Sequence, residues 1–385
     1  MKHNWEYKKL GEIGKIITGN TPNTKDAKNY ETNEICFVKP SDISGEGINY
    51  ISNSEFHISK YAYENSRQLP KGSILTTCIG NIGKVAILEI EATCNQQINA
   101  IIPNKDIDSK FLAYSIISQR YLLQSMANAP VVPILNKTQF SNFSISIPPL
   151  PTQQAIVSEL DTLSGIIAEC KETLKDYDAL EQSIFYDMFG DPVKNEKGWE
   201  VKKLGEIGIL ARGVSKHRPR NAPELLGGAM PLIQTGDVAN ADFLIEKYTN
   251  TYSELGVAQS KVWRKGTLCI TIAATIGKCA ILNFDACFPD SVVGFEPNNE
   301  ISEKIYVLFL FKNLQKILEE EAPAVAQKNI NLALLNNLTV PLPPLPLQQE
   351  FATKIEAIEQ MKAKTREALQ EAETLFQARM DYWFN

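Results

Sequence analysis

The sequence predicts a mixed α and β fold built as a tandem repeat, in which each copy is a globular α/β domain followed by one long helix. Three observations support this prediction. Long segments recur at an offset of 194 or 195 residues, short β-type runs open each copy, and a heptad pattern follows a proline-rich boundary in both. The predicted divisions are globular domains at 1–150 and 199–346, long helices at 151–190 and 347–385, and a linker at 191–198.

The repeat is clearest at the two ends of each globular domain. Residues 5–14 recur at 199–208 with nine of ten positions identical, and residues 147–154 match 342–349 around a shared P-P-L-P-x-Q-Q. By contrast, residues 18–70 and 212–264 share almost nothing recognisable. A shared frame with unrelated inserts indicates one scaffold that presents two different surfaces. Ordinary drift of surface loops is the alternative explanation.

The globular domains are expected to mix strands, loops and one helical patch. Short β-type runs at 35–38, 73–77 and 85–90 are separated by glycines, as in strands joined by tight turns. Apolar residues over 111–126 recur at helical spacing, and the second copy has a counterpart at 305–318.

The long helices are predicted from an apolar seam. Two prolines at 148–149 and a third at 151 end the preceding structure and suit a helix start. Apolar residues then recur at alternating spacings of four and three over 153–189, interrupted by Glu181. The matching seam over 348–384 is interrupted by Lys362, Thr365 and Arg379. Neither helix can bury its stripe alone, so each is the expected cover of the other.

Composition places the chain among globular proteins. Of its 385 residues 44% are hydrophobic and 22% charged, and no apolar run approaches the ~18 residues of a membrane span. The first residues lack the apolar stretch of a secretory signal, which favours the cytoplasm. Seven scattered cysteines without a C-x-x-C pair, and only three histidines, predict buried thiols and no metal site.

Catalytic motifs are missing from the sequence. The segment 80–84 has the Gly and Lys of a phosphate-binding loop, but Cys78 and Val85 stand where that loop needs Gly and Ser or Thr. No G-x-G-x-x-G unit, H-E-x-x-H or G-x-S-x-G occurs. The sequence therefore predicts a chain that is not an enzyme.

The charge distribution leaves room for a nucleic-acid partner despite a net charge of −6. Residues 151–198 hold 4 basic and 10 acidic groups, whereas 1–150 hold 15 and 13 and 199–346 hold 15 and 15. DNA recognition needs cations for phosphates and planar polar groups for base edges. A solvated loop is the alternative for any single residue. Candidate DNA-contacting residues are Lys25, Lys28, Asn29, Tyr30, Lys84, Asn95, Gln96, Gln97, Arg212, Lys216, Arg218, Arg220 and Lys278.

Together, the duplicated W-E-x-K-K-L-G-E-I start and P-P-L-P-x-Q-Q end, each followed by a heptad helix, resemble the specificity subunits of type I restriction–modification systems. The resemblance covers essentially the whole chain. It implies two target-recognition domains separated by two long antiparallel coiled-coil helices in a pseudo-two-fold internal repeat. Each domain would read one half of a bipartite, asymmetric double-stranded DNA target, and the helices would set the gap between the halves.

The resemblance also implies partners and cofactors. Two methyltransferase subunits would dock on the helices and bring S-adenosylmethionine, and restriction and translocase subunits would use ATP and Mg. The chain itself would bind no cofactor and no membrane.

Two other functions remain open on the sequence. The chain could be a coiled-coil scaffold that displays two protein-binding domains and never touches DNA, which would show no salt-dependent DNA retention. It could also be an enzyme with an unrecognised site, which a methyl-transfer assay on the isolated chain would reveal.

Overall fold

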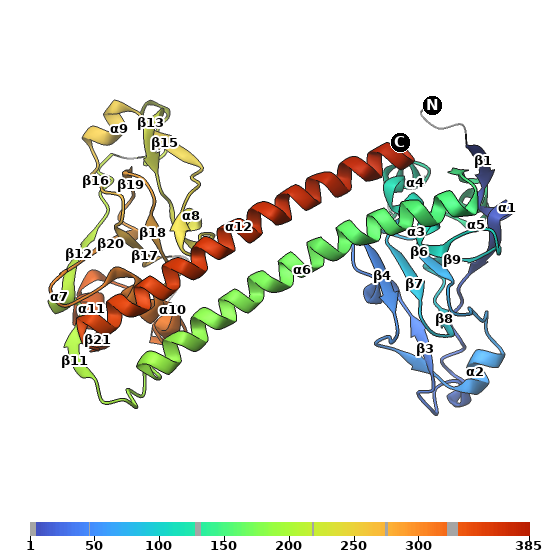
Figure 1. Cartoon of the computed structure of the whole chain (residues 1–385), viewed down its shortest axis with the longest axis horizontal. Helices are drawn as coiled ribbons and strands as arrows, with labels where there is room; N and C mark the ends of the chain where they lie inside the picture. The colour runs from blue at the N-terminus through green and yellow to red at the C-terminus, as the bar shows by residue number, and fades with distance from the viewer. Residues whose placement is uncertain (1–4, 46, 128–131, 218, 274–275, 322–329) are drawn as a thin grey trace. The chain divides into compact units, whose positions relative to one another are not determined.

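The computed structural model repeats one set of elements twice along the chain (Figure 1). It describes residues 5–45, 47–127, 132–217, 219–273, 276–321 and 330–385. The chain forms two compact units. The first comprises Met1–Cys170 and Ala368–Asn385, and the second comprises Lys171–Glu367. Each unit contains one globular domain and parts of both long helices. The mixed α and β fold predicted from the repeat is confirmed.

The globular domain of the first unit is organised around a five-stranded sheet in the order β2-β9-β6-β7-β4. Neighbouring strands are antiparallel except β4 and β7, which run parallel. Helix α3 (Ser109–Ser118) contacts β7 and β4 and closes one face over a core that includes Phe111 and Ile101. The strands are β2 (Gly14–Thr18), β4 (Ile48–Ile51), β6 (Ile74–Thr77), β7 (Val85–Leu88) and β9 (Ile98–Pro103).

A smaller three-stranded sheet, in the order β5-β3-β8, takes β3 and β5 from the segment 18–70 that the copies do not share. It consists of β5 (His57–Ile58), β3 (Ile35–Val38) and β8 (Ala92–Cys94). A separate apolar core joins it to the larger sheet, with Val38 and Cys94 packed near Leu75. The remaining short elements are 3₁₀ turns at Ala27–Asn29 and Pro40–Asp42 and the helices α2 (Lys60–Glu64) and α5 (Lys137–Asn142).

The helix predicted at 111–126 is two helices, α3 and α4 (Arg120–Ser125). The break lies at Gln119, whose backbone (φ −98°, ψ 17°) leaves the helical region. The Arg120 side chain then donates hydrogen bonds to the Ile82 carbonyl (3.0 Å) and to Asn81 Oδ1 (2.7 Å). Its counterpart α10 (Lys304–Glu321) continues as one helix.

The second unit repeats the five-stranded sheet in the order β12-β20-β17-β18-β14. These strands are β12 (Gly208–Arg212), β14 (Leu244–Ile245), β17 (Leu268–Thr271), β18 (Cys279–Leu282) and β20 (Val292–Pro297). Its smaller sheet has four strands in the order β15-β13-β19-β16: β13 (Leu226–Leu232), β15 (Asn250–Tyr252), β16 (Val262–Trp263) and β19 (Ala286–Cys287). Short helical elements are α8 (Thr235–Ala239), α9 (Glu254–Ala258), α11 (Leu332–Asn337) and a 3₁₀ turn at Pro223–Leu225. The five-stranded sheet is therefore the frame common to both copies, and the smaller sheets differ by the fourth strand, β16.

The repeated W-E-x-K-K-L-G-E-I segment forms a strand and one turn of helix in each copy. Strand β1 (Glu6–Lys9) pairs antiparallel with β10 (Ser144–Ile147), and β11 (Glu200–Lys203) pairs with β21 (Thr339–Leu342). The following turns, α1 (Leu10–Ile13) and α7 (Leu204–Ile207), bury both of their apolar residues. Each motif thus ties the start of a domain to the strand that leads into its long helix.

The long helices are α6 (Leu150–Phe189) and α12 (Leu345–Phe384), of 40 residues each. In the first unit, Glu159 near the start of α6 is hydrogen-bonded to Arg379 and Trp383 near the end of α12. In the second unit, Phe189 near the end of α6 packs edge-on against Phe351 near the start of α12, with ring centroids 5.2 Å apart. The helix segments therefore run antiparallel within each unit.

The first glutamine of each P-P-L-P-x-Q-Q motif joins the long helix to its domain. Gln153 and Gln348 are 1% and 0% exposed, and each side chain makes three hydrogen bonds to backbone groups. Their Oε1 atoms accept from the amides of Asp108 and Glu303 at 2.9 Å. The second copy thus reproduces the first bond for bond, which gives this shared motif a structural role.

Candidate nucleic-acid interface

The structure brings two of the sequence-predicted segments of the first copy together. The loop that follows β2 passes directly over the turn between β8 and β9, where a Cβ on Gly19 would lie 2.1 Å from the Asn95 carbonyl oxygen. The Asn20 amide donates to the Cys94 carbonyl at 2.9 Å, and Thr21 Oγ1 donates to Gln96 Oε1 at 2.7 Å. Residues 19–30 and 95–97 therefore form one surface, called here the first loop pair.

Within the loop that follows β2, the predicted residues divide into exposed charges and internal supports. Lys25 and Lys28 are exposed, and the Lys28 ammonium lies 5.9 Å from the ring centroid of Tyr61. Asn29 is buried, with Nδ2 donating to the Asn23 carbonyl at 3.0 Å. The Tyr30 hydroxyl donates to the Pro22 carbonyl at 2.9 Å. The lysines are available to an anionic partner, whereas Asn29 and Tyr30 hold the loop in shape.

The carboxamides of the 95–97 turn divide in the same way. Asn95 is buried, and its Nδ2 donates to Gln97 Oε1 at 3.0 Å while its Oδ1 accepts from the Gln97 amide. Gln96 is exposed at the top of the turn. Among these three carboxamides, Gln96 is the most exposed and so the best placed to contact a base edge.

The second copy builds the same arrangement from different residues. Gly213 passes over the β19–β20 turn, and a Cβ there would lie 2.1 Å from the Phe288 carbonyl oxygen. Arg212 is exposed at the end of β12. The Arg220 guanidinium pairs with Asp290 at 2.7 Å, so one predicted cation is already balanced by an acid. Arg218 lies outside the described residues. Residues 212–217, 219–220 and 289–291 are called here the second loop pair.

Lys216 is placed by its backbone. Its amide and that of His217 both donate to Gln259 Oε1, at 2.6 and 3.0 Å, and the Lys216 side chain is exposed. Ser260 Oγ donates to the Val214 carbonyl at 2.6 Å. The segment before β16 therefore clamps this loop.

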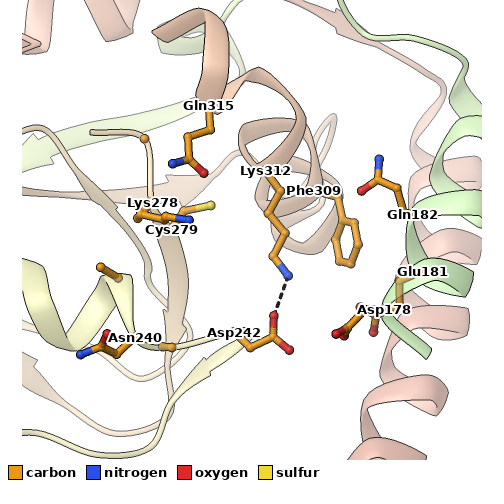
Figure 2. A pocket seen from close by; sticks show the side chains of 13 residues that line it. Asp178, Glu181, Gln182, Asn240, Asp242, Lys278, Cys279, Phe309, Lys312 and Gln315 are labelled. Atoms are coloured by element: carbon orange, nitrogen blue, oxygen red, sulfur yellow. Dashed lines mark hydrogen bonds and ion pairs between the residues drawn. The ribbon is translucent and has the colours of Figure 1, made fainter. Parts of the chain in front are cut away.

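The repeated lysines at 84 and 278 precede β7 and β18 directly and are not part of the loop pairs. Lys84 Nζ donates to the Ile43 carbonyl at 2.8 Å, an internal bond that links β7 to the segment before β4. Lys278 lines a pocket of about 480 Å³ together with Asp242, Lys312 and Glu181 (Figure 2). Their recurrence at equivalent positions reflects the shared frame of the two domains.

Arg67 is a cation at the first loop pair that the sequence analysis missed. Its guanidinium donates to the carbonyls of Thr18 and Gly19, its amide donates to Asn20 Oδ1, and the residue is exposed. The repeat gives no signal for it, because Arg67 lies in the segment 18–70 that the two copies do not share.

The cysteines are free thiols, and all except the half-buried Cys170 are buried, as predicted. Burial raises the pKa of Cys78 to about 11 and that of Cys94 to about 12, so both thiols stay protonated at neutral pH. In the described parts of the chain, no cluster of three or more His, Cys, Asp or Glu side chains is arranged to hold a metal ion. Among the described helices, none is both long and apolar enough to cross a membrane.

Comparison with known proteins agrees with the duplicated architecture. Residues 2–176 and 196–374 each match the type I restriction modification DNA specificity domain. The type I restriction enzyme MjaIX specificity subunit of Methanocaldococcus jannaschii is 26% identical over 380 residues, covering 92% of this chain and 86% of that protein. The EcoR124I/EcoR124II specificity subunit of Escherichia coli is 29% identical over 176 residues, covering 43% of each protein.

Solved structures show the same fold. The S subunit of a type I restriction–modification system from M. genitalium has a TM-score of 0.63 at 16% identity, covering 99% of this chain and 96% of that one. A chain from a structural study of type I R-M complex assembly has a TM-score of 0.59 at 21% identity, covering 98% and 96%. With both repeats matched by the family, the chain belongs to the type I restriction modification DNA specificity domain family.

Proposed function

We propose that this chain supplies the DNA sequence specificity of a type I restriction–modification complex and that each globular domain reads one half of a bipartite, asymmetric target. The chain is a non-catalytic specificity subunit that recognises DNA. One observation carries the finer proposal: the same frame holds two loop pairs at equivalent positions but with unrelated side chains.

The chemistry of each loop pair suits a different DNA sequence. The first presents Lys25 and Lys28 beside the exposed amide of Gln96. The second presents Arg212 and Lys216 beside Asp290. Lysine and arginine contact phosphates, and arginine, carboxamide and carboxylate groups discriminate bases in the major groove. Two unlike sets of such groups on one duplicated frame would read two unlike half-sites.

We divide the chain into target-recognition domains at 1–150 and 199–346, a linker at 191–198, and long helices at 151–190 and 347–385. The helices set the unread gap and dock two methyltransferase subunits. Their acidity supports a protein-binding role, because residues 151–198 carry 10 acidic and only 4 basic groups and would repel a phosphate backbone.

The partners supply the chemistry. The methyltransferase subunits bring S-adenosylmethionine, and restriction and translocase subunits bring ATP and Mg to the complex. The assembly acts on double-stranded DNA in the cytoplasm.

A domain exchange tests the proposal. Residues 199–346 are replaced by a second copy of 1–150, the chain is expressed with its cognate methyltransferase, and the methylated motif is determined by sequencing host DNA. Two identical readers in a pseudo-two-fold frame should recognise an inverted repeat of the first half-site. An unchanged asymmetric motif would contradict independent reading. DNA from a host without the chain, in which the motif should be unmethylated, is the control.

A further inference from the structure

A buried lysine lies in the helix seam of the second unit. Lys362 is 1% exposed, and its ammonium lies 2.7 Å from Asp178 Oδ1, 2.7 Å from Glu359 Oε1, 3.0 Å from Asp242 Oδ2 and 3.2 Å from Glu181 Oε2. A buried charge is tolerated only when it is paired and hydrogen-bonded. These carboxylates come from α6, from α12 and from the loop between α8 and β14, so Lys362 joins three separate parts of the unit.

Asp242 is the member of this cluster that belongs to the globular domain. It lies just before β14, an edge strand of the five-stranded sheet. Its carboxylate also contacts Arg366 of α12 at 3.2 Å and Lys312 of α10 at 3.4 Å. Figure 2 shows the side chain pointing toward Lys312, at the pocket that Asp178 and Glu181 of α6 also line. One carboxylate thus receives three cations, two of them from α12.

The Asp242 contact extends the attachment between this domain and α12 beyond the apolar core that Phe351, Ile355 and Ile358 share with the domain. At the start of the helix, Gln348 is bonded to Glu303 and Ile301 of the domain. Fourteen residues separate positions 348 and 362, which is ~21 Å along a helix. The apolar packing between these positions is non-directional. Polar contacts this far apart on one helix add direction to that packing and hold the angle between domain and helix.

We propose that the Asp242–Lys362 contact fixes the angle of the second target-recognition domain on the helices of its unit and so enforces the gap at which its half-site is read. This inference rests on the proposed role of the helices in setting that gap. Asp242 acts as a positioning residue, because its carboxylate pairs with Lys312 of α10 and with Lys362 and Arg366 of α12, outside the second loop pair.

The test variant is Asp242→Asn. It removes the charge that ties the domain to α12 and leaves Lys362 paired with Asp178, Glu181 and Glu359, so the helix segments stay joined. Lys312→Gln is a milder second perturbation, since it removes one cation from Asp242 and leaves all four carboxylate partners of Lys362 unchanged. The matched control is Asp285→Asn, which removes a half-buried carboxylate of the same domain that pairs with Arg264 at 2.6 Å.

Each variant is assembled with the cognate methyltransferase and assayed on DNA that carries both half-sites at the native gap or at a gap one base pair longer or shorter. Asp242→Asn should lower the preference for the native gap by about tenfold, within the usual range of coupling between two sites, and leave the bases read unchanged. Lys312→Gln should lower it less, and the control should keep it.

Two results would overturn the inference. One is an Asp242→Asn complex that keeps the wild-type gap preference, and the other is one that loses rate equally at all three gaps. The proposed function is tested separately by inserting one heptad into each long helix. If the insertion leaves the gap unchanged, the role of the helices fails. If the insertion lengthens the gap but Asp242→Asn and Lys312→Gln keep the wild-type gap preference, only the proposed role of the Asp242–Lys362 contact fails.

Discussion

The buried glutamine at the start of each long helix should be one of the most sensitive positions for stability. Gln348 Nε2 donates to the carbonyls of Pro343 (2.7 Å) and Ile301 (3.1 Å), and its Oε1 accepts from the Glu303 amide (2.9 Å). Replacing it by alanine leaves two carbonyls and one amide without these partners in a site with no exposure. Each bond contributes a net ~0.5–1.5 kcal/mol, so Gln348→Ala should lower the free energy of unfolding by about 2–4 kcal/mol.

The sequence offers a matched control beside each of these residues. Gln349 and Gln154 follow the buried glutamines directly and are exposed. Gln349→Ala should therefore change the free energy of unfolding by less than about 0.5 kcal/mol, as for ordinary surface positions. Gln348→Glu keeps the size of the side chain, but its carboxylate cannot donate to the two carbonyls. It should destabilise the protein at least as much as alanine does at neutral pH.

The assay is equilibrium unfolding in urea followed by tryptophan fluorescence, with Gln153→Ala measured in parallel. Gln153 makes the same three bonds, to Pro148, Asp106 and Asp108, so the two alanine variants should lose similar free energy. If Gln348→Ala and Gln349→Ala prove equally mild, these bonds do not hold the helix to its domain, and the structural explanation of the repeated motif is wrong.

Three further predictions concern charge and helix length. Burial raises the pKa of Glu181 to about 7. A raised carboxyl pKa contributes stability that is lost as pH rises from ~4.5 toward 7, so the free energy of unfolding of Glu181→Gln should rise relative to that of wild type between pH 5 and pH 8. Urea unfolding measures this difference, and the opposite trend would contradict the prediction. Arg212→Ala should weaken DNA binding and lower the slope of log Kd against log salt concentration by about one. Arg220→Ala should have a smaller effect, because Arg220 is already paired with Asp290. Equal effects of the two variants would show that this ion pair leaves Arg220 equally available to DNA. Inserting one heptad after Leu174 and one after Leu369 keeps the apolar seam in phase and adds ~10 Å to each helix. The gap between the half-sites of the methylated motif should therefore lengthen by about three base pairs. Methylation at full rate with the original gap would refute the proposal that the helices set the gap.

Sequence patterns predicted the frame because the frame is local and duplicated. The apolar runs at 73–77 and 85–90 contain the frame strands β6 and β7, and the run at 35–38 is β3 of the smaller sheet. The heptad segments predicted at 153–189 and 348–384 begin three residues earlier, at Leu150 and Leu345, because proline fits the first turn of a helix. Phe185 and Phe189 lie off the predicted α6 seam yet are buried, because the second globular domain covers another face of that helix.

The candidate site was harder to predict because exposure depends on tertiary contacts. Asn29 and Lys84 are polar residues of polar or glycine-rich segments, yet each donates its side-chain hydrogen bond to a backbone carbonyl of the same domain. Arg67 supports the first loop pair from a segment that the repeat does not align. The sequence shows which polar groups could contact DNA. The fold determines which of these groups already make hydrogen bonds within the protein.

The polar interruptions of the helix seams show what periodicity alone cannot supply. Glu181 and Lys362 break the apolar pattern when each helix is considered by itself, but together they form one ion pair at 3.2 Å. Arg379 interrupts the second seam and pairs with Glu159 of α6. In both units the acid lies on α6 and the base on α12, and the acid nearer the start of α6 meets the base nearer the end of α12. A buried polar pair in a helix seam specifies partner and register at some expense of stability. These interruptions therefore select the antiparallel pairing of α6 with α12, because an α6 helix aligned with a second α6 would bring carboxylates together in its seam.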